Sequence, residues 1–91
     1  MISYISIDRI EGDFVVCELE MIELEDSRPE DYETKETKMV MVPMKEFSDF
    51  QFVKEGDIFV VIHEGENVMA ICYKDDKQKA KRIEIMKTIL Q

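Results

Sequence analysis

The chain has 91 residues, of which 45% are hydrophobic and 36% charged, and its formal net charge is −9. A chain of this length has room for one hydrophobic core, so we expect a single domain spanning residues 1–91. Its 21 acidic and 12 basic residues argue against a phosphate-binding surface, so we expect no direct binding to nucleic acid. Apolar runs are shorter than the ~20 residues of a membrane span and the first residues lack a basic leader, so we expect no membrane association and a cytoplasmic location.

Two strands joined by a tight turn are predicted at the start of the chain. Residues 2–10 alternate between apolar and polar side chains, as a half-buried strand does. Gly12 and Asp13 then form a turn, since glycine tolerates a positive φ and aspartate favours turns. A second strand is expected from Phe14 to about Leu24. Its alternation changes phase near Ile22, which predicts a bulge or strong twist there.

The middle of the chain is first acidic and then apolar. Residues 25–37 predict an exposed acidic loop. Residues 39–44 are apolar on both faces up to Pro43, which is typical of a strand buried on both sides near its end. A short irregular segment follows and is expected to supply bulky apolar side chains, namely Phe47, Phe50, Phe52 and Val53.

Two further glycine turns precede the last two strands, which are expected at 58–63 and 68–73. The residues expected to form structural turns are Gly12, Asp13, Gly56, Asp57 and Gly65. The segments 10–16 and 54–61 look alike, and shared turn chemistry is a simpler explanation than duplication.

A C-terminal helix is predicted from Asp76 to Leu90, with Asp75 as its N-cap and Gln78 at the capping-box position. Its apolar residues cover an arc of roughly 220°, whereas docking on one surface needs about 100°. The surplus either packs on the 47–52 segment or forms a partner or self-association surface. The candidate interface residues are Ile85, Met86 and Ile89.

These elements predict a mainly β (α+β) fold, with a five-stranded antiparallel sheet, either an SH3-like barrel or a curved sheet, and one C-terminal α-helix. The helix is expected to plug or flank one open end. Residues 1–73 carry 18 acids and 6 bases, and residues 74–91 carry 3 acids and 6 bases. Body and helix should therefore attract each other, but exposed pairs contribute only about 0 to 1 kcal/mol each, so apolar packing is expected to hold the helix.

Two segments read in order, 7–16 (IDRIEGDFVV) and 53–58 (VKEGDI), resemble a family of small bacterial proteins known as domain of unknown function number three thousand and six. Val42-Pro43 and the basic closing helix are similar to its pattern as well. The acidic insert and the extra residues after Ile58 depart from it. The resemblance implies a small β-barrel-like body and a bacterial cytosolic setting, and it implies no catalytic residues.

Residue types that carry catalysis or bind metals are sparse. His63 is expected at the rim of a strand, and Cys17 and Cys72 are expected to be buried as small hydrophobic residues. Their number and spacing exclude a four-ligand zinc site, and the acids lack the spacing of a calcium loop. Arg9 is expected to pair with Asp13 or Asp57, or to face a partner. We expect no enzyme activity, no cofactor and no dedicated metal site.

Two classes of function are left by these observations. The first is a non-enzymatic accessory or protein-interaction module that binds an unknown protein partner, or a second copy, through the helix or the acidic loop. The second is an acidic nucleic-acid mimic that occupies a basic site on a DNA- or RNA-handling protein, which requires one continuous row of carboxylates. A small ligand inside the barrel would need a cavity that the methionine-rich, aromatic core is expected to fill.

Overall fold

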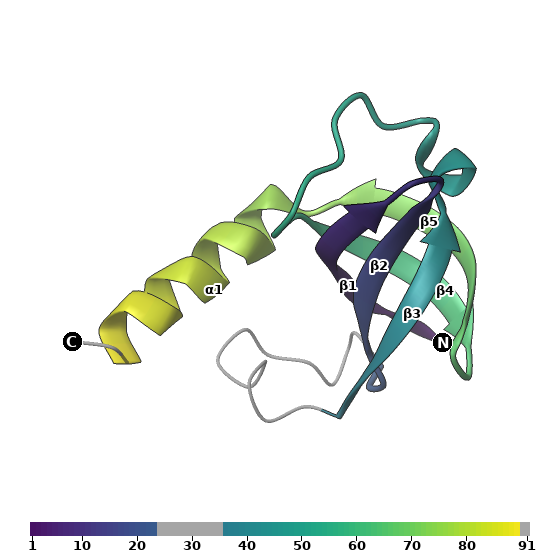
Figure 1. Ribbon diagram of the computed structural model, residues 1–91. Coiled ribbons are helices and arrows are strands. Elements are labelled where there is room, and N and C mark those ends of the chain that lie inside the picture. Colours follow the sequence, from purple (N-terminus) through teal and green to yellow (C-terminus); the bar gives the residue numbers. More distant parts are fainter. Residues whose placement is uncertain (24–35, 90–91) are drawn as a thin grey trace.

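The computed structural model describes residues 1–23 and 36–89 (Figure 1). Five strands form one antiparallel sheet in the order β3-β2-β1-β4-β5, and a helix follows them. The elements in chain order are β1 (Ile2–Glu11), β2 (Phe14–Glu20), β3 (Thr37–Pro43), the 3₁₀ turn η3 (Met44–Phe47), β4 (Ile58–Glu64), β5 (Asn67–Lys74) and α1 (Asp76–Ile89). The predicted mainly β (α+β) class is confirmed, as one open sheet with a C-terminal helix.

The long strand β1 bends the sheet because it pairs on both sides. Residues 2–6 of β1 pair with β4 and residues 5–11 pair with β2, so that Ile5 and Ser6 pair on both sides. The β1–β2 register shifts between Ile7 and Arg9, and a bulge of this kind increases local twist. The sheet consequently curls, with β1 to β3 in front of β4 and β5 (Figure 1).

The inner surface of the curled sheet holds the core. Alternate residues of the strands point inward, as the period of a strand requires. Phe47 and Phe50 add bulk from η3 and the segment after it, and both rings pack edge-to-face on Phe59, with centroids 5.2 and 5.0 Å away. The buried core residues are Ile5, Ile7, Val15, Cys17, Leu19, Val40, Val42, Phe47, Phe59 and Val61. Phe52 does not join them, because it is 71% exposed.

The turn at Gly56 also ties β4 to β1. Gly56 has a φ of +86°, which glycine adopts without strain. Its backbone N–H donates to Ile7 O, and Ile7 N–H donates to Asp57 O, both at 2.9 Å. Gly12 and Gly65, in the β1–β2 and β4–β5 turns, have positive φ as well, and the carbonyl of Asp13 accepts a bond from Met44 N at 2.8 Å.

Two strand predictions are wrong in detail. β2 ends at Glu20 and not near Leu24, which lies outside the described residues, and its ladder with β3 runs without a register shift. No bulge therefore falls at Ile22. β3 is also not buried on both sides: it is an edge strand whose outward residues Met39 and Met41 are more than half exposed. Most of the predicted 25–37 loop lies outside the described residues.

The helix α1 begins where predicted and ends, in the described part of the chain, at Ile89. Asp75 caps it by accepting a hydrogen bond from Gln78 N at 2.9 Å. Fourteen residues give a helix about 21 Å long. Its first turns lie beside the sheet, and its second half projects past the sheet (Figure 1).

Candidate functional site

The first two turns of α1 attach to the outer face of the sheet through buried polar groups. Arg82 Nη1 lies 2.6 Å from Glu20 Oε1 of β2, and the two side chains are only 7% and 3% exposed. The guanidinium also stacks 5.1 Å above the Tyr4 ring of β1. With the Gln78 amide oriented so that its oxygen faces Arg82, that oxygen accepts from Nη2 and Nε at 3.1 and 2.9 Å. Gln78 thus holds Arg82 and does not complete a capping box.

Tyr4 connects this cluster to the start of the helix. Its hydroxyl donates to Asp75 Oδ2 at 3.3 Å, while Asp75 Oδ1 caps α1. Burial, the charge of Asp75 and this hydrogen bond raise the pKa of Tyr4 to about 12. Tyr4 is therefore a neutral donor that fixes Asp75 in the capping position.

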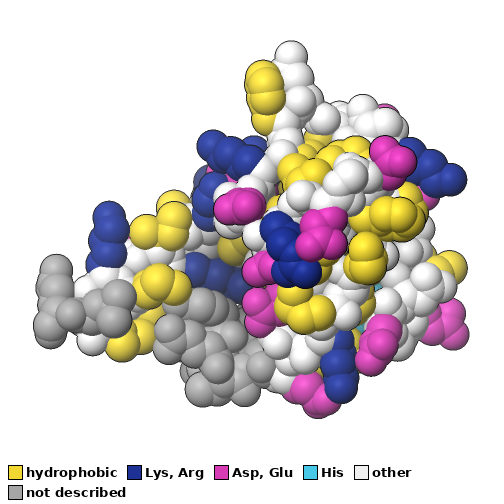
Figure 2. Space-filling model, in the orientation of Figure 1, with side chains coloured by type: hydrophobic (Ala, Val, Ile, Leu, Met, Phe, Trp, Pro, Cys, Tyr) yellow, Lys and Arg dark blue, Asp and Glu magenta, His cyan; other side chains and the backbone are white. Residues whose placement is uncertain are grey.

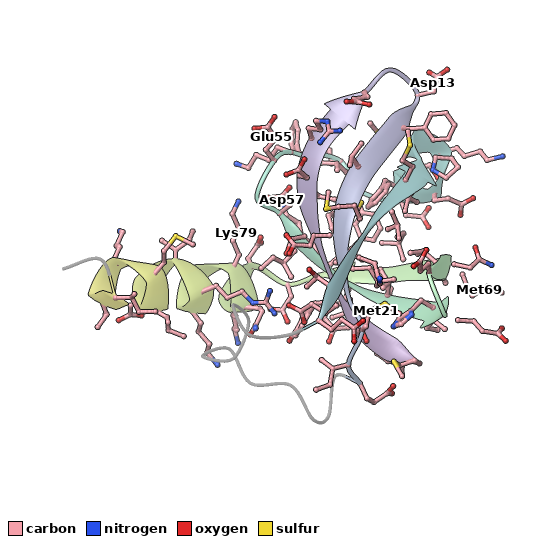
Figure 3. All side chains as sticks on the ribbon, turned by 60° about the horizontal axis from the view of Figure 1, so that its bottom comes forward. Asp13, Met21, Glu55, Asp57, Met69 and Lys79 are labelled. Atoms are coloured by element: carbon pink, nitrogen blue, oxygen red, sulfur yellow. The ribbon has the colours of Figure 1, made fainter. Side chains whose placement is uncertain are left out.

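A second anchor is Asp57, which follows the Gly56 turn and is fully buried. Lys79 Nζ of α1 donates to Asp57 Oδ1 at 3.0 Å, Lys54 N donates to Oδ2 at 3.0 Å, and Lys74 Nζ lies 3.4 Å from Oδ2. Burial alone would raise the pKa of Asp57, but the hydrogen bonds and the two ammonium groups lower it overall. Asp57 and Lys79 lie close together where α1 leaves the sheet (Figure 3).

The docked face of α1 continues beyond the anchors as an apolar stripe. Ile85, Met86 and Ile89 follow Arg82 by three, four and seven residues, so they lie on its face of the helix. Ile85 is half-buried, whereas Met86 and Ile89 are 43% and 59% exposed. In the described residues α1 buries only Gln78 and Arg82. We call Ile85, Met86 and Ile89 the interface face.

A groove lies between α1 and the outer side of the sheet, and Met86 is the one residue of the interface face that lines it. Its volume is about 260 Å³, and it is lined by Ser6, Glu18, Gly56, Ile58, Lys79, Arg82, Ile83 and Met86. Figure 2 shows hydrophobic and basic side chains along α1, and acidic and hydrophobic side chains intermixed over β1 to β3. Of the two alternatives for the surplus apolar arc, packing of Ile89 on the 47–52 segment is not observed, since Phe47 and Phe50 pack on Phe59 and Ile89 is mostly exposed.

Two polar residues lie elsewhere than the sequence predicted. Arg9 pairs with Asp8 and Glu11, each at 2.6 Å, on an exposed part of β1, and not with Asp13 or Asp57. His63 is not at a rim, because it is 2% exposed. Its ring nitrogens lie 2.8 Å from Gly65 O and 3.0 Å from Ser3 Oγ, so it is a satisfied core residue.

The two cysteines differ. Cys17 is buried in the core as predicted, and burial raises the pKa of its thiol to about 12. Cys72 is exposed on β5, contrary to the prediction, and neither thiol is in a disulfide.

Sequence reasoning did not find the anchors Glu20, Gln78, Lys79 and Arg82. Alternation along β2 places Glu20 on the side opposite the core residue Leu19, but alternation does not show that a helix covers that side. The available signal was the opposite net charge of residues 1–73 and residues 74–91. It predicted that the helix and the sheet attract each other, but not that their ion pair is buried. In the described part of the chain α1 buries only Gln78 and Arg82, so the contacts that hold it on the sheet are mainly polar, whereas the sequence predicted apolar packing.

Comparisons with family models, curated proteins and solved structures return no match. The resemblance to domain of unknown function number three thousand and six therefore stays a prediction. Across residues 1–23 and 36–89, no three His, Cys, Asp or Glu side chains are grouped so that they could hold a metal ion. No helix in the same part of the chain is long and apolar enough to cross a bilayer.

Proposed function

We propose that this protein is a non-enzymatic interaction module and that α1 is its recognition element. The observation that carries the proposal is the interface face, which continues the docked side of the helix past the sheet without being covered by its described residues. An amphipathic helix presenting such a stripe is a common way to bind a groove in another protein. The cytoplasmic location belongs to the same proposal and is supported by the exposed, unbridged Cys72.

The charges of α1 indicate the chemistry of the partner. Lys79 and Arg82 are used within the chain, but Lys81, which lies one turn before Ile85 and on its side of α1, and Lys87, which lies further round the helix, are exposed. A partner should therefore offer an apolar patch rimmed by carboxylates, which would attract these lysines during encounter.

Ion pairs make the acidic nucleic-acid mimic the weaker candidate. A mimic needs unpaired carboxylates in a row, yet Asp8 and Glu11 share Arg9, and Glu20 pairs with Arg82. Direct binding to nucleic acid is disfavoured for another reason. Partly open five-stranded barrels of the OB type bind oligonucleotides with the β1–β2 and β4–β5 loops, and here these loops carry acids: Glu11, Asp13, Glu64 and Glu66.

Site-specific photocrosslinking in cells of the native host tests the proposal. A photoreactive residue at position 86 should crosslink to a protein, whereas the same residue at position 80, on the opposite face of α1, should not. The captured protein is then purified and titrated with the chain. Met86→Glu/Ile89→Glu should weaken binding at least tenfold, and the matched control Ala80→Glu/Thr88→Glu should not. Equal crosslinking at both positions, or equal affinity of both variants, would contradict the proposal.

A further inference from the structure

The directions of the two edge strands allow one added strand to pair with both. Every neighbouring pair in the order β3-β2-β1-β4-β5 is antiparallel, so the edge strands β3 and β5 run in the same direction. A single added strand can therefore run antiparallel to both edges at once. Such a strand would meet outward N–H and C=O groups of β3 on one side and of β5 on the other.

The two edges also line a common slot. Four consecutive residues of β3, Val40–Pro43, and the four residues 66–69 at the start of β5 line it together with Glu46, and its volume is about 270 Å³. Four residues of extended chain span about 13 Å. Below the slot, Val40 and Val42 are buried, and the half-buried Val68 packs against the core. The surface of the slot itself is mostly polar, which suits pairing through backbone groups, and the half-buried Val68 offers apolar contact to the inward side chains of an added strand.

The protection that is usual for an edge strand is confined to the ends of β3. Edge strands commonly carry an internal lysine or proline that prevents pairing with another chain. Lys38 stands just before the slot and Pro43 at its end, whereas Met41 and Met69 beside the slot are 57% and 56% exposed. The slot instead carries negative charge from Glu46 and Glu66.

We propose that the β3–β5 slot binds an extended peptide segment of a partner protein, in which apolar residues alternate with basic ones. The apolar residues face Val42 and Val68, and the basic residues face Glu46 and Glu66. This strand-capture site does not depend on α1, since Met69 lies on the side of the molecule away from the helix (Figure 3). It goes beyond the proposed function by adding a second, separate recognition surface.

The probe is a blocked peptide of alternating valine and lysine, about eight residues long, titrated to millimolar concentration against the ¹⁵N-labelled chain. Amide signals of β3 and β5 should shift, and their hydrogen exchange should slow as edge groups become paired. Glu46→Lys/Glu66→Lys should weaken binding at least tenfold, while the matched charge reversal Asp49→Lys/Glu55→Lys, on exposed acids outside the slot, should have a much smaller effect.

Two further peptides and one variant decide the outcome. A peptide N-methylated at alternate residues should lose binding, and a valine–glutamate peptide should bind far more weakly. Met86→Glu/Ile89→Glu should leave the shifts in β3 and β5 unchanged, which separates this proposal from the function proposed for α1. Shifts confined to α1, equal binding by the N-methylated peptide, or concentration-dependent protection of β3 without peptide, as pairing with a second copy would give, would overturn it.

Discussion

Removing one partner of the Glu20–Arg82 pair should release α1 from the sheet. In the variant Glu20→Leu the guanidinium of Arg82 would remain at a site that is 7% exposed, without the carboxylate of Glu20. Breaking a buried pair in this way costs about 3 to 5 kcal/mol, whereas breaking an exposed pair costs about 0 to 1 kcal/mol. Arg82 keeps the Tyr4 ring and the Gln78 amide, so we expect the lower value, about 3 kcal/mol.

Because α1 is peripheral, this loss should appear first as local opening. A detached helix of this length is only marginally stable in water. Hydrogen exchange of the α1 amides should accelerate roughly 100-fold, since about 1.4 kcal/mol corresponds to a factor of ten, while β1 and β2 amides change little. The double variant Glu20→Leu/Arg82→Met replaces the pair by apolar groups and should restore most of the protection. Unchanged exchange of α1 in the single variant would refute the conclusion that polar groups hold the helix.

Three further outcomes are expected. The pKa of Asp57 is lowered in the folded state, so its contribution to stability is present above the unfolded pKa of about 3.9 and is lost as the pH falls through the folded value. In urea unfolding, the loss of unfolding free energy caused by Asp57→Asn should be largest above about pH 5 and should shrink below about pH 4. A loss that does not change with pH, or an equal loss for the exposed Asp49→Asn, would contradict this. Ellman's reagent should titrate one of the two thiols in the native chain, and Cys72→Ser should abolish the reaction; reaction of Cys17 at the same rate would show that it is not buried. Tyr4→Phe should remove a tyrosinate absorbance step near pH 12, and persistence of that step would assign it to another tyrosine.

Much of the fold was predictable because the local sequence signals for turns, strands and the helix start agree with the way the core packs. The glycine turns and the alternation of β1 and β2 locate the hairpins, and Asp75 marks the start of α1. The length of β2 was overestimated because Met21 and Ile22 are apolar. Apolar type alone does not distinguish a strand residue from one that only packs against the core beyond the strand end, as Met21 does.

The candidate site was predictable only in part. The width of the apolar arc indicated Ile85, Met86 and Ile89 as interface residues, and the structure places them on one face of α1. Burial of Glu20 and Arg82 could not be predicted, because it depends on contacts between residues far apart in the sequence. The same reason applies to His63, whose Nε2 is hydrogen-bonded to Ser3 Oγ of another strand. The exposure of Cys72 and of β3 follows from the strand order, which periodicity does not give.

The most direct test of the central claim is the free energy of unfolding of Met86→Glu/Ile89→Glu, measured by urea denaturation. If the interface face is free to receive a partner, the variant should unfold within about 0.5 kcal/mol of the unaltered chain, as exposed substitutions generally do. A loss of about 2 kcal/mol or more would show that these side chains are packed within the chain, and it would contradict the account.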